Sequence, residues 1–140
     1  MNHKSGMNEK LKKIVEEKIR HTVDGIEETL VQVVENLNLS LEDLGEAIKN
    51  LERSFGLLSQ KWSLEILYTL FFREESGFND LKRILKVNSR TLSSKLKILC
   101  RHGYVERSVE YGPPLRVSYK LTEKGRNTVL LALPLLYYLA

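Results

Sequence analysis

Basic and hydroxyl side chains recur at helical spacing between Ser89 and Gly103. Because successive helical residues are about 100° apart, one face of a helix here carries Arg90, Ser94, Lys97 and Arg101. The opposite face carries three leucines, Leu92, Leu96 and Leu99, which should face a core. A helix with an apolar back and a cationic, hydroxyl-bearing front suits the major groove of DNA. The alternative is an ordinary surface helix whose basic face is solvated.

The ends of this helix carry their own signals. Ser89 is expected to act as the N-cap residue and to accept a hydrogen bond from a free backbone amide. Gly103 suits the left-handed conformation just past a helix C-terminus. Upstream, Asn79 is expected to cap a short helix over residues 80–86, and residues 87–88 form the turn between the two helices. Two short helices joined by such a turn predict a helix-turn-helix.

The apolar residues change from helical to alternating spacing after this helix. Residues 104–110 and 115–121 predict two antiparallel strands, and Tyr111-Gly112-Pro113-Pro114 between them is strong turn chemistry. A hairpin that directly follows a helix-turn-helix is a wing. Thr122 is then expected to cap a last helix.

The order of these elements predicts a winged helix, a mainly α-helical α+β fold. Its three-helix core would include residues 61–73, which are apolar around most of a helix and place Trp62 in the interior. Residues 74–77 are expected to form a polar turn. The domain boundaries that we expect are a flexible N-terminus over 1–7, a helical extension over 8–56, a DNA-binding winged helix over 57–126 and a C-terminal dimerisation helix over 127–140.

A long helical pattern occupies residues 8–37. Its apolar residues form a heptad seam with spacings of four and three: Ile19, Val23, Ile26, Leu30, Val33 and Leu37. A helix of roughly 45 Å is long for a domain of this size and should lie against another surface. We expect pairing with a second copy of the chain; the alternative is packing over its own core. Ser40 and Asp43 then form a capping signal for a helix over 41–58, whose outer face is acidic.

The segment from Val129 to Ala140 is apolar on nearly every side and contains Pro134. A membrane span needs about 20 residues, so this run is too short and no membrane partner is expected. Burial against a second subunit is the simplest solution for such a surface. The residues that we expect in this part of the dimer interface are Leu130, Leu133, Leu136 and Tyr137.

Charge is distributed unevenly along the chain, whose formal net charge is +4. Residues 21–53 carry two Lys/Arg against eight Asp/Glu, whereas residues 54–140 carry fourteen against seven. A basic region that coincides with the predicted helix-turn-helix is the electrostatic footprint of a polyanion binder. The only cysteine, Cys100, allows no intramolecular disulfide, which fits a cytoplasmic protein, and it is expected to be a packing residue.

Several classes of function lack the residue patterns that they require. The three histidines are scattered without ligand spacing, so no metal site is expected. The sequence has no glycine-rich phosphate loop and no paired carboxylates beside a histidine, so neither an enzyme nor a cofactor is expected.

Residues 57–126 resemble the HxlR-type winged-helix transcriptional regulators, relatives of the MarR group. The motifs that carry the resemblance are Lys61-Trp62, Phe78-x-Asp80-Leu81, Ser89-Arg90-Thr91-Leu92-Ser93, Lys95-Leu96-x-x-Leu99, His102-Gly103-Tyr104-Val105-x-Arg107, Pro114-x-Arg116-Val117-x-Tyr119 and Leu121-Thr122-Glu123-Lys124-Gly125. The resemblance implies a homodimeric, cytoplasmic regulator that dimerises through its N- and C-terminal helices and binds double-stranded DNA.

The sequence departs from the family pattern at several positions. Gln60 stands where the family usually has Gly before Lys-Trp, and Gly77 stands where an Arg often precedes the Phe. The chain lacks the N-terminal cysteine that serves thiol sensing in many members, so thiol sensing at that site is not expected. The helix over 8–37 exceeds the usual short N-terminal helix of the family.

We expect base contacts from the first turns of the recognition helix and phosphate contacts from the surrounding cations. The base-reading residues are Ser89, Arg90, Thr91 and Ser94, with Lys97 further along. The residues expected at phosphates are Lys82, Arg83, Lys86, Arg107 and Arg116, with Lys95 near the backbone, Arg101 towards the far end of the helix and Tyr111 at the wing tip. Arg90 is the best single candidate, because a guanidinium can form two hydrogen bonds with guanine. For each single cation the alternative is plain solvation.

These patterns predict a sequence-specific transcriptional regulator with helix 89–102 in the major groove and wing 110–116 on the backbone or minor groove. We expect a homodimeric repressor, although no residue pattern distinguishes repression from activation. A small-molecule effector at the dimer interface is compatible with this arrangement, although no residue pattern names one. Two rival functions are a winged-helix module that binds protein and an architectural DNA-binding protein without sequence preference. Competition-resistant binding to one duplex sequence would exclude both.

Overall fold

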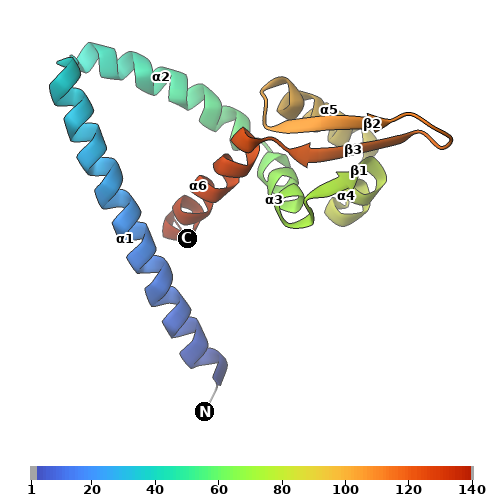
Figure 1. Cartoon of the computed structure of the whole chain (residues 1–140), viewed down its shortest axis with the longest axis horizontal. Coiled ribbons are helices and arrows are strands. Elements are labelled where there is room, and N and C mark those ends of the chain that lie inside the picture. The colour runs from blue at the N-terminus through green and yellow to red at the C-terminus, as the bar shows by residue number, and fades with distance from the viewer. Residues whose placement is uncertain (1–2, 140) are drawn as a thin grey trace. The chain divides into compact units, whose positions relative to one another are not determined.

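The computed structural model describes residues 3–139 (Figure 1). The chain divides into two units, Met1–Leu51 and Glu52–Ala140, and each is described by itself. The first unit holds helix α1 (His3–Leu37) and most of helix α2 (Leu41–Leu58). The second unit holds the end of α2 and all the remaining helices and strands.

Helix α1 begins at His3, five residues before the predicted start. The flexible terminus predicted over 1–7 is therefore wrong for residues 3–7, and residues 1 and 2 lie outside the described part. Residues 3–7 contain no proline, and extending an existing helix is much easier than starting one, so the helix continues backwards past Asn8.

Helix α2 begins with the capping box that the sequence predicted. The backbone amide of Asp43 donates to Ser40 Oγ (3.1 Å), and the backbone amide of Ser40 donates to Asp43 Oδ2 (3.1 Å). These hydrogen bonds hold the pKa of the Asp43 carboxyl below its usual value. The reciprocal pair fixes the start of α2 after the break at 38–40.

Helix α3 (Ser63–Arg73) lies at the centre of the second unit and buries Ile66, Leu67 and Leu70. It begins two residues later than predicted, because Trp62 has a left-handed backbone (φ 77°) that no helix interior adopts. Trp62 is half-buried and packs against the edge of the core.

Helices α4 (Phe78–Leu85) and α5 (Ser89–Arg101) form the helix-turn-helix. Asn79 is not the N-cap of α4, because Gly77 takes that position and Phe78 already lies in the helix. Ser89 is not the N-cap of α5 either. Asn88 has the extended backbone of a cap residue, and its Oδ1 accepts a hydrogen bond from the Thr91 amide at 2.8 Å.

Three short strands form an antiparallel sheet in the order β1-β3-β2 (Figure 1). Strands β2 (Val105–Glu110) and β3 (Arg116–Leu121) are the predicted hairpin, with Glu110 opposite Arg116 at its outer end. Strand β1 (Glu75–Gly77) pairs with the other edge of β3 and corrects the prediction of a polar turn over 74–77. Three residues show no alternation, and the pairing partner lies more than 40 positions away.

Helix α6 (Glu123–Leu139) follows β3 directly, and its start is capped by Thr122 as predicted. Thr122 Oγ1 accepts from the Gly125 amide (3.0 Å) and donates to the Gly103 carbonyl oxygen (2.5 Å). The first turns of α6 bury Val129, whereas most of the later apolar residues are exposed. Together these elements confirm the predicted winged helix. Its core residues are Ile66, Leu67, Leu70, Leu81, Val87, Leu92, Leu96, Leu99, Tyr104, Val105, Tyr119 and Val129.

Candidate nucleic-acid interface

Helix α5 separates an apolar back from a polar front. Leu92, Leu96 and Leu99 are at most 1% exposed, as the helical spacing predicted. The residues expected on the front are all exposed: Ser89, Arg90, Ser94, Lys97 and Arg101. Thr91 is half-buried, because its position lies between the two faces. The packing of the leucines therefore holds the basic face towards solvent, where a polyanion can reach it.

Lys95 is half-buried and makes a specific contact with a residue outside the helix-turn-helix. Its Nζ donates a hydrogen bond to Gln60 Oε1 at 2.9 Å. Gln60 lies just before α3, 35 positions away, at the site where the sequence departs from the family pattern. The contact holds the ammonium group of Lys95 against its own protein rather than on the open face of α5.

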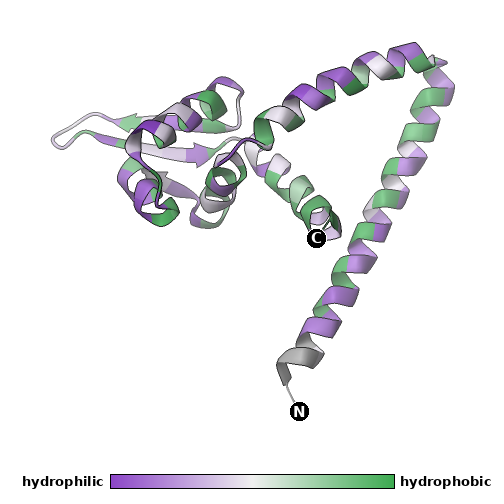
Figure 2. Cartoon of the chain, turned by 180° about the vertical axis from the view of Figure 1, so that it is seen from behind, coloured by the Kyte–Doolittle hydropathy of each residue, from purple (hydrophilic) through white to green (hydrophobic). Residues whose placement is uncertain are grey.

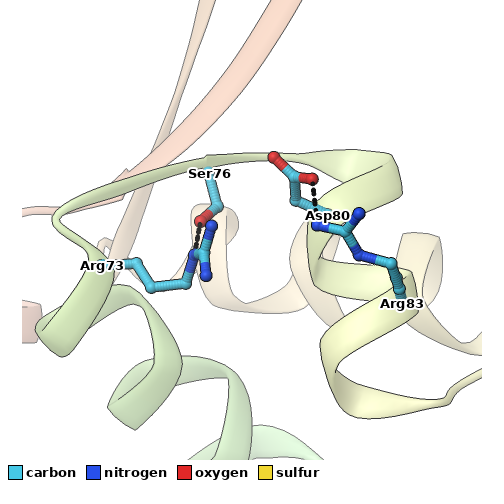
Figure 3. A network of polar contacts seen from close by, with 4 residues as sticks. All are labelled: Arg73, Ser76, Asp80 and Arg83. Carbon is cyan, nitrogen blue, oxygen red and sulfur yellow. Dashed lines mark hydrogen bonds and ion pairs between the residues drawn. The ribbon is translucent and has the colours of Figure 1, made fainter.

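The cations of α4 are exposed but differ in their partners. Lys82 and Lys86 have no ion pair within the described residues, whereas Arg83 Nη2 lies 2.9 Å from Asp80 Oδ1 (Figure 3). The same figure shows Arg73 Nε donating to Ser76 Oγ (3.3 Å), which links the end of α3 to β1. Part of the positive charge of Arg83 is therefore already neutralised within the helix.

The wing carries three of the predicted residues, all of them exposed: Arg107, Tyr111 and Arg116. Tyr111 is 87% exposed and begins the loop between the strands. Arg116 lies opposite Glu110 in the ladder, so its charge has an acidic neighbour at the end of the hairpin. Further along, Lys120 Nζ pairs with Glu106 Oε1 at 3.1 Å.

Arg107 lies close to Cys100, near the C-terminal end of α5. Burial raises the pKa of the Cys100 thiol, and the positive charge of Arg107 partly offsets that increase. The half-buried thiol packs against the core, as the sequence predicted. Arg107 therefore lies beside the C-terminal end of α5 and not beside its first turns.

The C-terminal end of α5 is tied to the start of α6. Besides the Thr122–Gly103 hydrogen bond, Lys124 Nζ donates to the His102 carbonyl oxygen at 3.0 Å. The same ammonium group lies 4.5 Å from the centroid of the Tyr104 ring. The Thr122 amide also donates to the Tyr104 carbonyl oxygen at 3.1 Å. These contacts fix the end of the helix that carries the basic face.

Two residues with a part in this surface were missed by the sequence analysis. Asn88 caps α5, and an Asn-Ser pair at the helix start contained that signal, because both residue types cap helices well. Gln60 contacts Lys95 through the tertiary fold, and no local pattern indicates that contact.

The residues predicted for dimerisation lie on exposed surfaces of their own units. In α1, Val23, Ile26, Leu30, Val33 and Leu37 are exposed, and Ile19 is half-buried. In α6, Leu130, Leu133, Leu136 and Tyr137 are between 39% and 44% exposed. Figure 2 shows apolar positions along both helices. No helix within residues 3–139 is long and apolar enough to cross a membrane, and the described residues hold no cluster of metal-ligating side chains.

The fold and the exposed basic helix define this chain as a winged-helix DNA-binding protein. A family model described as HxlR-like helix-turn-helix matches residues 57–136, more than half of the chain. The chain belongs to this family, in agreement with the resemblance in its sequence.

Individual relatives support the same assignment. The chain is 34% identical over 77 residues to the HTH-type transcriptional regulator YdzF of Bacillus subtilis, covering 54% of this chain and 71% of that protein. It is 35% identical over 93 residues to the regulator BH0655 of Halalkalibacterium halodurans, covering 62% and 82% of the two chains. The crystal structure of diamide-treated YodB from B. subtilis matches with a TM-score of 0.54 and 30% identity, over 64% of this chain and 86% of that one. The chain is thus a DNA-binding transcriptional regulator and not an enzyme.

Proposed function

We propose that the chain acts as a homodimeric, sequence-specific repressor. Helix α5 enters the major groove, and the wing over 110–116 meets the backbone or the minor groove. The observation that carries this proposal is the exposure of Arg90, Ser94 and Lys97 on a helix whose opposite face is fully buried. Such a helix presents a fixed row of donors at the width of one groove.

Base reading is assigned to the first turns of α5. Arg90 and Ser94 are exposed, and Arg90 has no ion pair within the described part of the chain. A guanidinium that is not already paired can give both of its donors to guanine O6 and N7. Ser89, Thr91 and Lys97 complete this set. Because Asn88 supplies the cap, the Ser89 hydroxyl is not needed for capping and is available to DNA.

Phosphate contacts are assigned to the cations around α5: Lys82, Arg83, Lys86, Arg107, Arg116 and Arg101. We rank their expected contributions to phosphate binding by whether each cation already has an acidic neighbour. Lys82 and Lys86 should contribute more than Arg83, which pairs with Asp80, and more than Arg116, which faces Glu110. Lys95 should contribute least while its Nζ stays on Gln60. Phosphate contacts position the protein and give binding its dependence on salt.

Dimerisation is assigned to the exposed apolar surfaces of α1 and α6. A monomer would leave Leu130, Leu133 and Leu136 in water, at a cost of about 25 cal/mol for each Å² of apolar surface. A dimer would also present two copies of α5, which fits half-sites about one helical turn or a multiple apart. We also infer a cytoplasmic location, where the DNA of bacteria such as those of the named relatives lies.

The test begins with selection of bound duplexes from a random pool. Fluorescence anisotropy then compares the parent with the Arg90→Ala/Lys97→Ala double variant on the selected duplex. Loss of one bidentate base contact costs about 1–3 kcal/mol, so affinity should fall roughly 5- to 150-fold. Lys49→Ala is the matched control, because Lys49 is exposed on α2 and pairs with Glu46.

Three results would count against the assignment. Parent-like affinity of the double variant would mean that α5 does not read the duplex. Equal affinity of the parent for selected and random duplexes would indicate architectural binding. A comparable loss in the Lys49→Ala control would mean that only net charge matters.

A further inference from the structure

We propose that α1 pairs with α1 of a second copy in antiparallel orientation, as a two-stranded coiled coil. The proposal rests on the homodimer of the proposed function and specifies the arrangement of its N-terminal part. That arrangement lies outside the residues matched by the family model, which begin at residue 57.

The surface is an apolar stripe along the C-terminal half of α1. It is the heptad seam, which begins at Ile19 and ends at Leu37, where 65% of the residue is exposed. Leu11, Ile14 and Val15 precede the seam and lie outside its a and d positions. The two ends of the seam are 18 positions apart, or roughly 27 Å along a helix. A stripe of this length matches a partner helix rather than a compact ligand.

Charge selects the orientation of the partner. Residues 3–20 carry six Lys/Arg and three Glu, a net charge of +3, whereas residues 21–37 carry four Asp/Glu and no Lys/Arg, a net charge of −4. A parallel pair would bring like halves together. An antiparallel pair brings the basic half of each helix against the acidic half of the other. Interspersed and facing charges of this kind set partner orientation in coiled coils.

The seam and the charges together define the register. When Ile19 of one copy lies level with Leu30 of the other, Val23 lies level with Ile26. Arg20 then lies two positions from the level of Glu27 in the other copy. Arg20 and Glu27 are seven residues apart and both occupy the e position beside the seam. In an antiparallel pair, the e positions of one helix face the e positions of the other. Two-fold symmetry produces this ion pair twice.

The middle of α1 also has room for a partner. A shallow hollow is lined by Thr22, Gly25, Ile26, Thr29, Leu30 and neighbouring side chains. A Cβ atom at Gly25 would have no atom within 4 Å, so the absent side chain leaves open space there. Coiled-coil helices insert side chains into holes between residues of the facing helix, and this hollow suits such an insertion near the two-fold axis.

Cysteine cross-linking tests the orientation directly. In a Cys100→Ser background, the Ile19→Cys/Leu30→Cys double variant is oxidised and run on a non-reducing gel. We expect a covalent dimer from the double variant and none from either single variant, because an antiparallel pair brings residue 19 beside residue 30. The two cysteines of one chain are too far apart to bond to each other. Glu17→Cys/Gln32→Cys is the matched control: its two positions are exposed and lie at the same axial level on the outer face, so this variant should stay monomeric on the gel.

Each alternative gives a different result. Cross-linking of the Leu30→Cys single variant with itself would show a parallel pair. Absence of any cross-link in the double variant would show that α1 has another partner, such as the apolar face of α2. Either result overturns the proposal.

A charge exchange provides a second measurement that does not depend on cysteine. Arg20→Glu should weaken dimerisation about tenfold in sedimentation equilibrium, since two ion pairs become repulsions. Adding Glu27→Arg should restore it in an antiparallel pair, and failure to restore it would contradict the proposal. Anisotropy on the selected duplex is measured for the same variants. Absence of DNA binding by the parent would contradict the proposed function, whereas the gel and the charge exchange decide the orientation of α1.

Discussion

At the scale of single residues, Gly125 is the one glycine of the described chain at which an added Cβ atom would overlap the backbone. It lies in the first turn of α6, where a Cβ atom would overlap the carbonyl oxygen and carbon of Tyr104. The Tyr104 backbone cannot move aside easily, because its carbonyl oxygen accepts the Thr122 amide. The glycine therefore allows the start of α6 to pack directly against the backbone of Tyr104, three residues after the end of α5.

We predict that Gly125→Ala destabilises the winged helix by about 1–3 kcal/mol or more, the usual cost of overpacking. Thermal denaturation followed by circular dichroism measures this loss. Gly45→Ala in α2 is the matched control, because nothing lies within 4 Å of its added Cβ. That variant should gain up to about 1 kcal/mol of helix stability. Equal melting temperatures for the two variants would contradict the close approach at Gly125.

The residue types predicted which face of a helix is buried and which is exposed better than they predicted individual contacts. The buried leucines and exposed cations of α5 follow from helical spacing alone. The cap residue was misplaced by one position, because Asn88 and Ser89 are both good N-caps and only the backbone angle decides between them. The link between Gln60 and Lys95 depends on where two distant segments meet, which no local pattern contains.

At the scale of elements, α5 is fixed at both ends. Asn88 closes its N-terminus through the Thr91 amide, and the contacts of Thr122 and Lys124 hold its C-terminus. The order of a DNA-reading helix before binding matters, because each residue that must be ordered on binding reduces affinity.

We predict that Asn88→Ala lowers the free energy of unfolding by about 0.5–2 kcal/mol, since a helix amide loses its acceptor. Ser89→Ala should change stability by less than about 0.5 kcal/mol and yet weaken binding to the selected duplex. Urea denaturation and anisotropy on both variants separate capping from contact. The reverse pattern, with Ser89→Ala the less stable variant, would show that Ser89 and not Asn88 is the N-cap of α5.

Element types were predictable where a pattern extended over several residues. The long helices and the wing each repeat their period often enough to be recognised. Strand β1 has only three residues and exists because the free edge of β3 accepts its hydrogen bonds, with Ser76 paired to Tyr119. Its stability comes from tertiary pairing, so the sequence around it indicated only a turn.

At the scale of the whole molecule, the apolar face of α6 remains exposed to solvent in a single copy of the chain. Leu136 lies on this face with 39% of its surface exposed. We predict that Leu136→Glu weakens dimerisation by at least tenfold, because a buried unpaired carboxylate costs several kcal/mol. Sedimentation equilibrium measures the dissociation constant. Asn127→Glu, exposed on the other side of α6, should leave it unchanged. An unchanged dissociation constant for Leu136→Glu would show that α6 is not part of the dimer interface.

The junction between α5 and α6 has a thermodynamic consequence. The hydrogen bonds from Thr122 and Lys124 join the end of α5 to the start of α6. We therefore expect the angle of α5, the helix proposed to read DNA, to follow the packing of α6. If subunit association alters operator affinity by some factor, then operator binding must alter the association constant by the same factor, because coupling between two equilibria is reciprocal. DNA would thus act as an effector of assembly, and the operator itself would set how much of the protein is dimeric.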